Sequence, residues 1–163
     1  MESLPADVTR SVLYLLDDAD LANVCFLNRD FSKKLCDDTF WLNKIINKYG
    51  LTSDEIKKYK KNNSYLAYYV KLSEDTENLN PNDMLSMGSK KERADLMIIA
   101  LKRGANVHVN NDYPLRYASS YGHTEVVRLL LENGANVHAN NDEALRVASG
   151  SYPDIVKLLE KYV

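Results

Sequence analysis

A segment of nine residues occurs twice in this chain, with 30 residues between the starts of the two copies. GANVHVNND runs from Gly104 to Asp112, and GANVHANND runs from Gly134 to Asp142. The match continues beyond these segments with the same offset, at Leu115 and Leu145, Arg116 and Arg146, Ala118 and Ala148, and Ser119 and Ser149. Such a period is typical of a solenoid, in which each unit buries its apolar face only against its neighbours.

Each copy is predicted to form a pair of helices. A short segment with small residues is followed by a connection and then by an apolar segment such as TEVVRLLLEN, whose valines and leucines recur at helical spacing. Gly104 and Gly134 follow the apolar segments, where a helix often ends in a left-handed residue that glycine adopts without steric cost. A degenerate copy begins near residue 80 and the last copy is shortened, so we predict about two and a half units.

The segments PLRYASSYGHTEVVRLLLENGANV and ALRVASGSYPDIVKLLEKYV resemble ankyrin repeats, whose pattern is T-P-L-H-x-A followed by G-H-x-E-V-V-x-L-L-L-x-x-G-A-x-V. The chain departs from this pattern in two places. Tyr113 and Glu143 replace the usual threonine, and Arg116 and Arg146 replace the usual histidine. The hydrogen-bonded tie that threonine and histidine make in the family is therefore not expected in its usual form.

The resemblance also implies where a partner binds. Ankyrin repeats usually hold protein partners on their concave face and at the tips of their fingers. Only nine residues separate Gly104 from Pro114, about three fewer than in the common unit, so the fingers are expected to be short. An unidentified protein target is expected on exposed finger and first-helix positions: Asn110, Asn111, Tyr113, Arg116, Tyr117 and Arg146.

The segment from Leu4 to Trp41 has no counterpart in the repeat and is predicted to form three short helices. Pro5 is placed to begin the first helix, Asp20 begins the second, and the third reaches Trp41. The succession resembles an F-box, which opens with Leu-Pro, starts its second helix with Asp-Leu and closes with Asp-x-x-x-Trp. Departures from that pattern are Thr9, Asn28 and Phe31.

An F-box implies binding to the Skp adaptor of SCF-type ubiquitin ligases, while the rest of the chain recruits a target for ubiquitination. The adaptor-binding positions implied by the resemblance are Leu4, Pro5, Val8, Leu21, Val24, Leu27 and Trp41. Leu4, Pro5 and Val8 can form an exposed apolar anchor or, equally, internal core. In the alternative interpretation the N-terminal helices only cap the repeat stack, and the chain is a non-catalytic ankyrin scaffold or decoy.

Residues 46–79 are expected to form a helical connector. Gly50 is placed to end one helix, and Thr52–Glu55 has the pattern of a capping box that begins the next. The lysines of KKYKK are expected on a solvated face, and the tyrosines of SYLAYY either pack to join the two modules or form an aromatic recognition strip. The predicted fold class is all-α, with an F-box-like module over residues 1–45, this connector, and an ankyrin solenoid over residues 80–163.

Composition and motifs argue against several other classes of protein. A net charge of −2 gives no broad attraction for nucleic acid or for an anionic membrane, and no apolar run approaches the roughly 18 residues that span a bilayer. The start MESLPADVTR lacks the basic and apolar parts of a secretory signal, so an intracellular location is expected. The order of modules resembles proteins of large DNA viruses, which implies the cytoplasm of an infected host cell.

No catalytic or cofactor site is predicted. His108, His123 and His138 are explained by their places in the repeat, and the chain has no phosphate-binding loop, nucleophile elbow or paired metal-ligand motif. Cys25 and Cys36 lack the spacing of a zinc site or a disulfide framework. They are predicted to be small buried apolar side chains.

Overall fold

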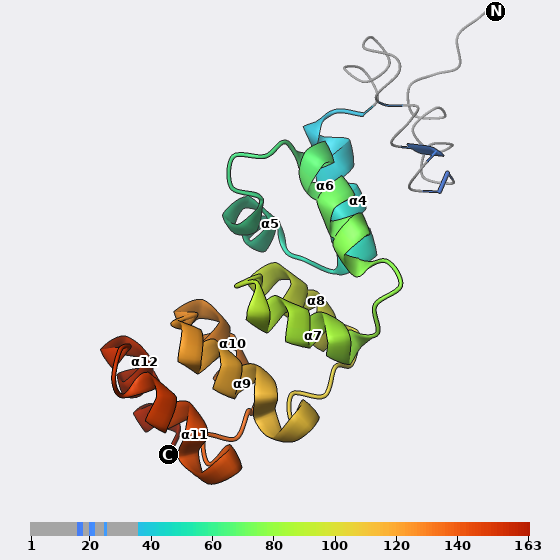
Figure 1. The fold of residues 1–163 in the computed structure, drawn as a ribbon. Coiled ribbons are helices and arrows are strands. Elements are labelled where there is room, and N and C mark those ends of the chain that lie inside the picture. The colour runs from blue at the N-terminus through green and yellow to red at the C-terminus, as the bar shows by residue number, and fades with distance from the viewer. Residues whose placement is uncertain (1–15, 18–19, 22–24, 26–35) are drawn as a thin grey trace, which may run out of the picture. The chain divides into compact units, whose positions relative to one another are not determined.

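The structure is a computed structural model that describes residues 16–17, 20–21, 25 and 36–163. This described part contains helices and turns and no strand, so the all-α prediction is confirmed for it. The chain divides into two compact units, Met1–Glu77 and Asn78–Val163 (Figure 1). Most of the predicted F-box-like module lies outside the described residues.

The first unit contains α4 (Asp38–Tyr49), α5 (Ser53–Lys60) and α6 (Tyr65–Thr76), and α4 packs against both of the others. The predicted boundary between residues 45 and 46 therefore falls inside α4.

Local signals in the sequence place the ends of these helices. The side chain of Asp37 accepts the N–H of Phe40 at 2.8 Å and begins α4, which ends at Gly50 with a φ of 68°. The predicted capping box of α5 is confirmed, because Thr52 and Glu55 exchange hydrogen bonds of 2.6 and 3.2 Å between side chain and backbone.

Aromatic side chains form the core between α4 and α6. Trp41 and Tyr69 are fully buried, with ring centroids 5.1 Å apart, and the ring of Tyr49 lies 6.1 Å from that of Tyr69. Burial, and secondarily the neighbouring Tyr49, raises the pKa of the Tyr69 hydroxyl above its ordinary value. Tyr68 and Tyr69 therefore pack inside this unit and are not part of an exposed recognition strip, and that the tyrosines join the two modules stays a prediction.

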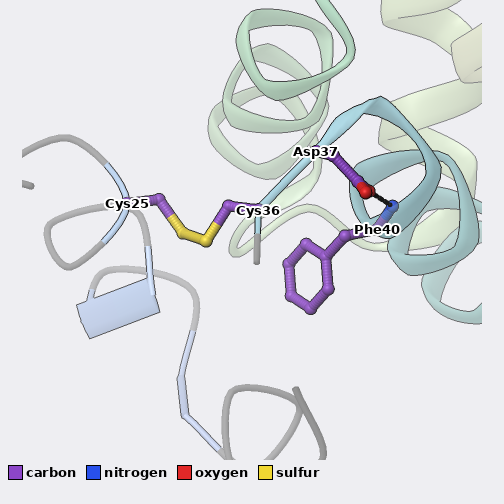
Figure 2. The surroundings of a disulfide bond; sticks show 4 residues. All are labelled: Cys25, Cys36, Asp37 and Phe40. Atoms are coloured by element: carbon purple, nitrogen blue, oxygen red, sulfur yellow. Dashed lines mark hydrogen bonds between the residues drawn. A yellow bond between two sulfur atoms is a disulfide. The ribbon is translucent and has the colours of Figure 1, made fainter. Parts of the chain in front are cut away.

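Cys25 and Cys36 form a disulfide bond (Figure 2). Both side chains are buried, as predicted, but the prediction that they are unbonded was wrong. Their Cα atoms lie 6.2 Å apart, within the range that a disulfide bridges. A separation of 11 residues along the chain does not reveal this proximity, which depends on the fold. Disulfides persist mainly in oxidising compartments, so this bond does not support the expected intracellular location, which stays a prediction.

Reduction of this disulfide is expected to lower the free energy of unfolding of the first unit by about 2–3 kcal/mol, because the bond restricts the unfolded chain. Trp41 is the single tryptophan and is buried in this unit, so its fluorescence reports the transition. The denaturant midpoint should fall when a thiol reductant is added. A Cys25→Ser/Cys36→Ser variant should show the lower midpoint with or without reductant, and equal wild-type midpoints in both conditions would contradict the prediction.

The second unit consists of three successive helix pairs (Figure 1). They are α7 (Pro81–Lys90) with α8 (Ala94–Lys102), α9 (Val109–Tyr121) with α10 (Thr124–Glu132), and α11 (Ala139–Ala148) with α12 (Pro153–Leu159), followed by the 3₁₀ turn η1 (Glu160–Tyr162). The first helix of the middle pair, α9, packs against α7 and α11, and α10 packs against α8 and α12. The first helices thus lie side by side in one layer and the second helices in another.

Glycines end the second helices of the first two pairs as predicted. Gly104 and Gly134 have φ values of 84° and 88°, in the left-handed region that disfavours other residues. None of the helices in the described part of the chain is long and apolar enough to cross a membrane.

Candidate functional site

The recurring Asn-Asn-Asp sequence forms a left-handed turn at the start of α9 and again at the start of α11. Residues 110–112 have φ values of 52°, 57° and 54°, and residues 140–142 have values of 54°, 59° and 55°. Asparagine and aspartate are the residues other than glycine that adopt this region most readily. The repetition of Asn110 and Asn111 as Asn140 and Asn141 is therefore explained by the backbone of the short finger.

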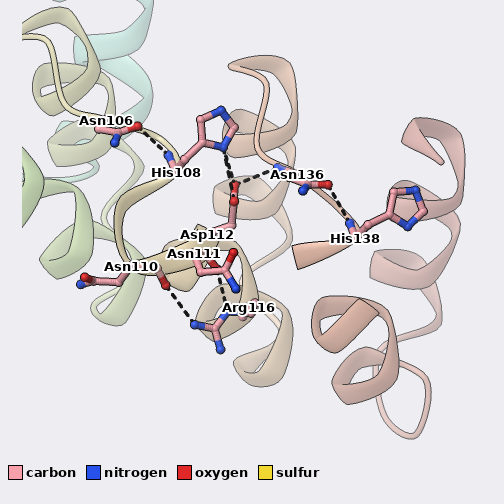
Figure 3. Close-up of polar contacts among 8 residues, drawn as sticks. All are labelled: Asn106, His108, Asn110, Asn111, Asp112, Arg116, Asn136 and His138. Carbon is pink, nitrogen blue, oxygen red and sulfur yellow. Dashed lines mark hydrogen bonds and ion pairs between the residues drawn. The ribbon is translucent and has the colours of Figure 1, made fainter. Parts of the chain in front are cut away.

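Successive repeats are joined by a ladder of hydrogen bonds from side chain to backbone. The Oδ1 atom of Asn82 accepts the N–H of Asn106 at 2.7 Å. Figure 3 shows the equivalent bond one repeat later, in which the Oδ1 atom of Asp112 accepts the N–H of Asn136 at 2.8 Å. Asp112 is buried, and the Nδ1 atom of His108 lies 3.0 Å from its Oδ1 atom. The acceptor at this position thus fixes the finger of the next repeat.

Replacing Asp112 with alanine is expected to lower the free energy of unfolding by about 1–2 kcal/mol, because the part-buried hydrogen bond to the N–H of Asn136 is lost. Circular dichroism during urea unfolding measures the loss. The matched control is Asp112→Asn, which keeps an oxygen acceptor like that of Asn82 and should retain most of the stability. A loss in the asparagine variant as large as in the alanine variant would show that the acceptor is not the cause.

Arg116 makes a second tie between repeats. Its Nε and Nη2 atoms donate to the carbonyl oxygens of Asn111 and Asn110 at 3.0 and 3.1 Å. Its Nη1 atom donates to Glu143 Oε2 in the next repeat at 2.5 Å. Hydrogen bonds from Asn140 and from Arg116 hold the pKa of the Glu143 carboxyl below its usual value. Arg116 and Glu143, two of the four residues that depart from the family pattern, thus form a tie of their own.

Three tyrosines form a strip along α9. Tyr113, Tyr117 and Tyr121 follow one another at four-residue intervals, with ring centroids 5.7 and 4.5 Å apart. The Nζ atom of Lys90 on α7 lies 5.5 Å from the centroid of the Tyr113 ring, so the strip reaches the first repeat. Tyr121 is 58% exposed, which makes it the most exposed large apolar side chain among the helices that the structure describes.

Sequence reasoning identified Tyr113 and Tyr117 but missed Tyr121, although the pattern YxxxYxxxY places all three on one side of a helix. Partial burial and a hydrogen bond with Tyr121 raise the pKa of the Tyr117 hydroxyl. We call the layer of α7, α9 and α11 the first-helix face. Its tyrosine strip combines apolar rings with polar hydroxyl tips, a combination common at protein interfaces.

The predicted target-binding residues differ in how accessible they are. Asn110, Asn111 and Arg146 are exposed, whereas Tyr113, Arg116 and Tyr117 are half-buried. The guanidinium of Arg116 is occupied by the bonds described above, and its side chain is only 16% exposed. Tyr121 therefore offers more contact surface than Arg116 does.

Two of the predicted adaptor-binding residues, Leu21 and Trp41, are described by the structure, and both are fully buried. Any part they take in binding would act through packing of the first unit. The other five lie outside the described residues: Leu4, Pro5, Val8, Val24 and Leu27.

In the part of the chain that the structure describes, no three histidine, cysteine, aspartate or glutamate side chains come together in a way that could hold a metal ion. His108 and His138 face Asp112 and Asp142 of their own repeats, at 3.0 and 2.7 Å.

Residues 85–162 match the ankyrin-repeat family, in three copies. The second unit is therefore a stack of three ankyrin repeats, and its last copy, which was predicted to be shortened, forms both of its helices. Ankyrin repeats are generally non-catalytic domains that bind other proteins, which gives this chain a role in protein–protein interaction. No curated protein matches the chain. The F-box resemblance of residues 4–41 stays a prediction.

Proposed function

We propose that this protein is an adaptor that binds one partner through its N-terminal segment and a second through the first-helix face of its ankyrin repeats. Binding of the second partner to the first-helix face is supported by the tyrosine strip, which is partly exposed and ends at the accessible Tyr121. Tyrosines are enriched in interface hot spots, since a rigid ring supplies contact area at little cost in conformational entropy.

For the first half we propose binding to the Skp adaptor of an SCF-type ubiquitin ligase, so that the protein on the ankyrin repeats becomes the target of ubiquitination. This proposal is supported by the sequence from Leu4 to Trp41 and by its place ahead of a domain that binds proteins. The alternative is an ankyrin scaffold or decoy, in which the N-terminal helices bind no adaptor.

A pull-down with purified eukaryotic Skp adaptor separates the two functions. Wild-type protein is compared with a Leu4→Asp/Pro5→Ala variant, and Lys58→Asp, a change at an exposed position of α5, is the matched control. The fluorescence of Trp41 reports whether each variant keeps its first unit folded. Binding by the wild type and the control, but not by the folded double variant, supports the ubiquitin-ligase adaptor. If the wild-type protein does not bind the Skp adaptor, the result supports the ankyrin scaffold or decoy instead.

The target-binding half is tested by photo-crosslinking in cells. A photoreactive amino acid replaces Tyr121 in one variant and Lys102, an exposed position on α8, in another. A cross-linked protein that appears only with position 121 supports the first-helix face as the target site. The same cross-links from both positions would show that binding is not directed to this face.

A further inference from the structure

A row of apolar side chains crosses the first-helix face. Met87, Tyr117 and Val147 occupy the same position in the three repeats, on α7, α9 and α11, because 30 residues separate each from the next. All three side chains are half-buried. Since α9 packs against both α7 and α11, these positions are neighbours across the face. The row gives the face an apolar centre that a second protein can cover.

Two exposed lysines lie at the end of α7. Lys90 is the last residue of this helix, and Lys91 follows it at the C-cap. The negative end of a helix dipole favours basic residues at such positions. Lys90 also reaches the next repeat, because its Nζ atom lies 5.5 Å from the centroid of the Tyr113 ring on α9. The tyrosine strip therefore has an ammonium group beside its first ring.

Acidic side chains near these lysines have partners of their own within the stack. Asp83 accepts a hydrogen bond from the side chain at the N-cap of α7, and Glu143 accepts one from Arg116. Glu92, in the turn after α7, lies 3.9 Å from Nδ1 of His123 in the next repeat. The two lysines form no ion pair with the residues that the structure describes. Their charge is therefore available to a partner.

We propose that the α7 and α9 part of the first-helix face binds an acidic segment of the target protein. Carboxylates of that segment pair with Lys90 and Lys91, and its apolar side chains pack on Met87 and on the tyrosine strip. This inference rests on the proposed function, since it names the chemistry of the target that the first-helix face holds. The apolar contacts supply most of the affinity, and the opposite charges select and orient the segment.

A nucleic acid also carries negative charge, but it matches this face less well. Affinity for a phosphate backbone grows with the number of lysine and arginine contacts, and α7 offers two exposed lysines. Single strands stack successive bases on aromatic rings, whereas Tyr113 and Tyr117 are half-buried and Tyr121 is exposed. The aliphatic side chains of the apolar row fit the side chains of a protein better than a phosphate backbone.

Peptide selection on the full chain tests this surface. Random peptides displayed on phage are selected for binding to the wild type, and the enriched peptides are labelled so that fluorescence anisotropy measures their Kd. We expect aspartate or glutamate beside aliphatic or aromatic residues in these peptides. Lys90→Glu/Lys91→Glu should weaken their binding by about tenfold or more, because like charges then face each other.

The matched control changes two exposed lysines of the second helix layer and of the 3₁₀ turn that follows it. Lys157→Glu/Lys161→Glu makes the same change in charge on α12 and η1, and it should bind the peptides like the wild type. Tyr121→Ala removes an exposed ring of the strip and should weaken binding, while circular dichroism shows that the variant is folded. These results together would support the acidic segment.

The outcomes distinguish this inference from the function on which it rests. Peptides that lose binding in Tyr121→Ala but lack acidic residues, or that bind the Lys90→Glu/Lys91→Glu variant like the wild type, would overturn the acidic segment and leave the first-helix face as the target site. Peptides that bind both variants like the wild type, or no enriched peptide at all, would count against both proposals. Tighter binding of a labelled oligothymidine, lost in the Lys90→Glu/Lys91→Glu variant, would assign the face to nucleic acid instead.

Discussion

Replacing Leu130 with alanine is expected to lower the free energy of unfolding of the ankyrin unit by about 2–5 kcal/mol. Leu130 is fully buried on α10, the middle helix of the second layer, which packs against α8, α9 and α12. The shorter side chain loses apolar contacts and leaves a cavity. The surrounding helices prevent this cavity from collapsing fully, so the loss is large. Urea unfolding followed by the circular dichroism of the helices measures the loss.

The matched control is Leu158→Ala on α12, because this leucine is half-buried in the third repeat. Less apolar surface is removed from contact there, so the loss should be under about 1.5 kcal/mol. Equal losses at the two positions would show that the core between the repeats does not determine the stability of the stack.

Replacing Gly122 with alanine is expected to cost about 2–4 kcal/mol, for two separable reasons. Gly122 has a φ of 79°, and a residue with a Cβ atom is less stable in that region by about 1–2 kcal/mol. The added Cβ atom would also lie 2.4 Å from Cε1 of Tyr152, on the third repeat, so that ring must move. The steric cost thus falls on the contact between the second and third repeats.

Gly134→Ala separates these two costs. Its φ of 88° is similar, but a Cβ atom there has no neighbour within 4 Å, so only the conformational cost of about 1–2 kcal/mol is expected. The difference between the two variants in urea unfolding measures the contact with Tyr152. If both variants lose the same stability, Tyr152 moves aside freely and the packing argument is wrong.

The tyrosine strip illustrates how far the sequence leads toward a candidate site. A period of 30 residues and the helical pattern place Tyr113 and Tyr117 on the first helix of a repeat before any coordinates are known. The stacking of Tyr117 on Tyr121 and the large exposure of Tyr121 depend on how α9 lies between α7 and α11. The pattern therefore predicts the helix, and the neighbouring helices decide which of its rings remain accessible.

The finger residues show the opposite case, in which a repeated sequence pattern has two explanations, one functional and one conformational. Recurrence of Asn-Asn-Asp at an expected binding surface favoured a role for Asn110 and Asn111 in binding a target. The left-handed turn gives these residues a conformational role whether or not they bind. Arg116 was also expected at the binding surface, and its guanidinium is used between the repeats.

The sequence by itself determined the features that depend on near neighbours along the chain. The cap of α5 at Thr52 and the left-handed ends at Gly50, Gly104 and Gly134 depend on side chains and backbone within a few residues. The repeat period is likewise visible in the sequence, because each unit buries the same kind of apolar face against its neighbour.

Only the tertiary structure decided the features that join distant segments. The Cys25–Cys36 disulfide, the bond from Asp112 to Asn136 and the tie from Arg116 to Glu143 all depend on where the helices bring their side chains. The same is true of burial in the third repeat, since Leu145 and Val156 carry the same pattern as the fully buried Leu115 and Val127 but are only half-buried. Spacing along the chain fixes which side of a helix a residue occupies, and the packing of helices fixes what that side contacts.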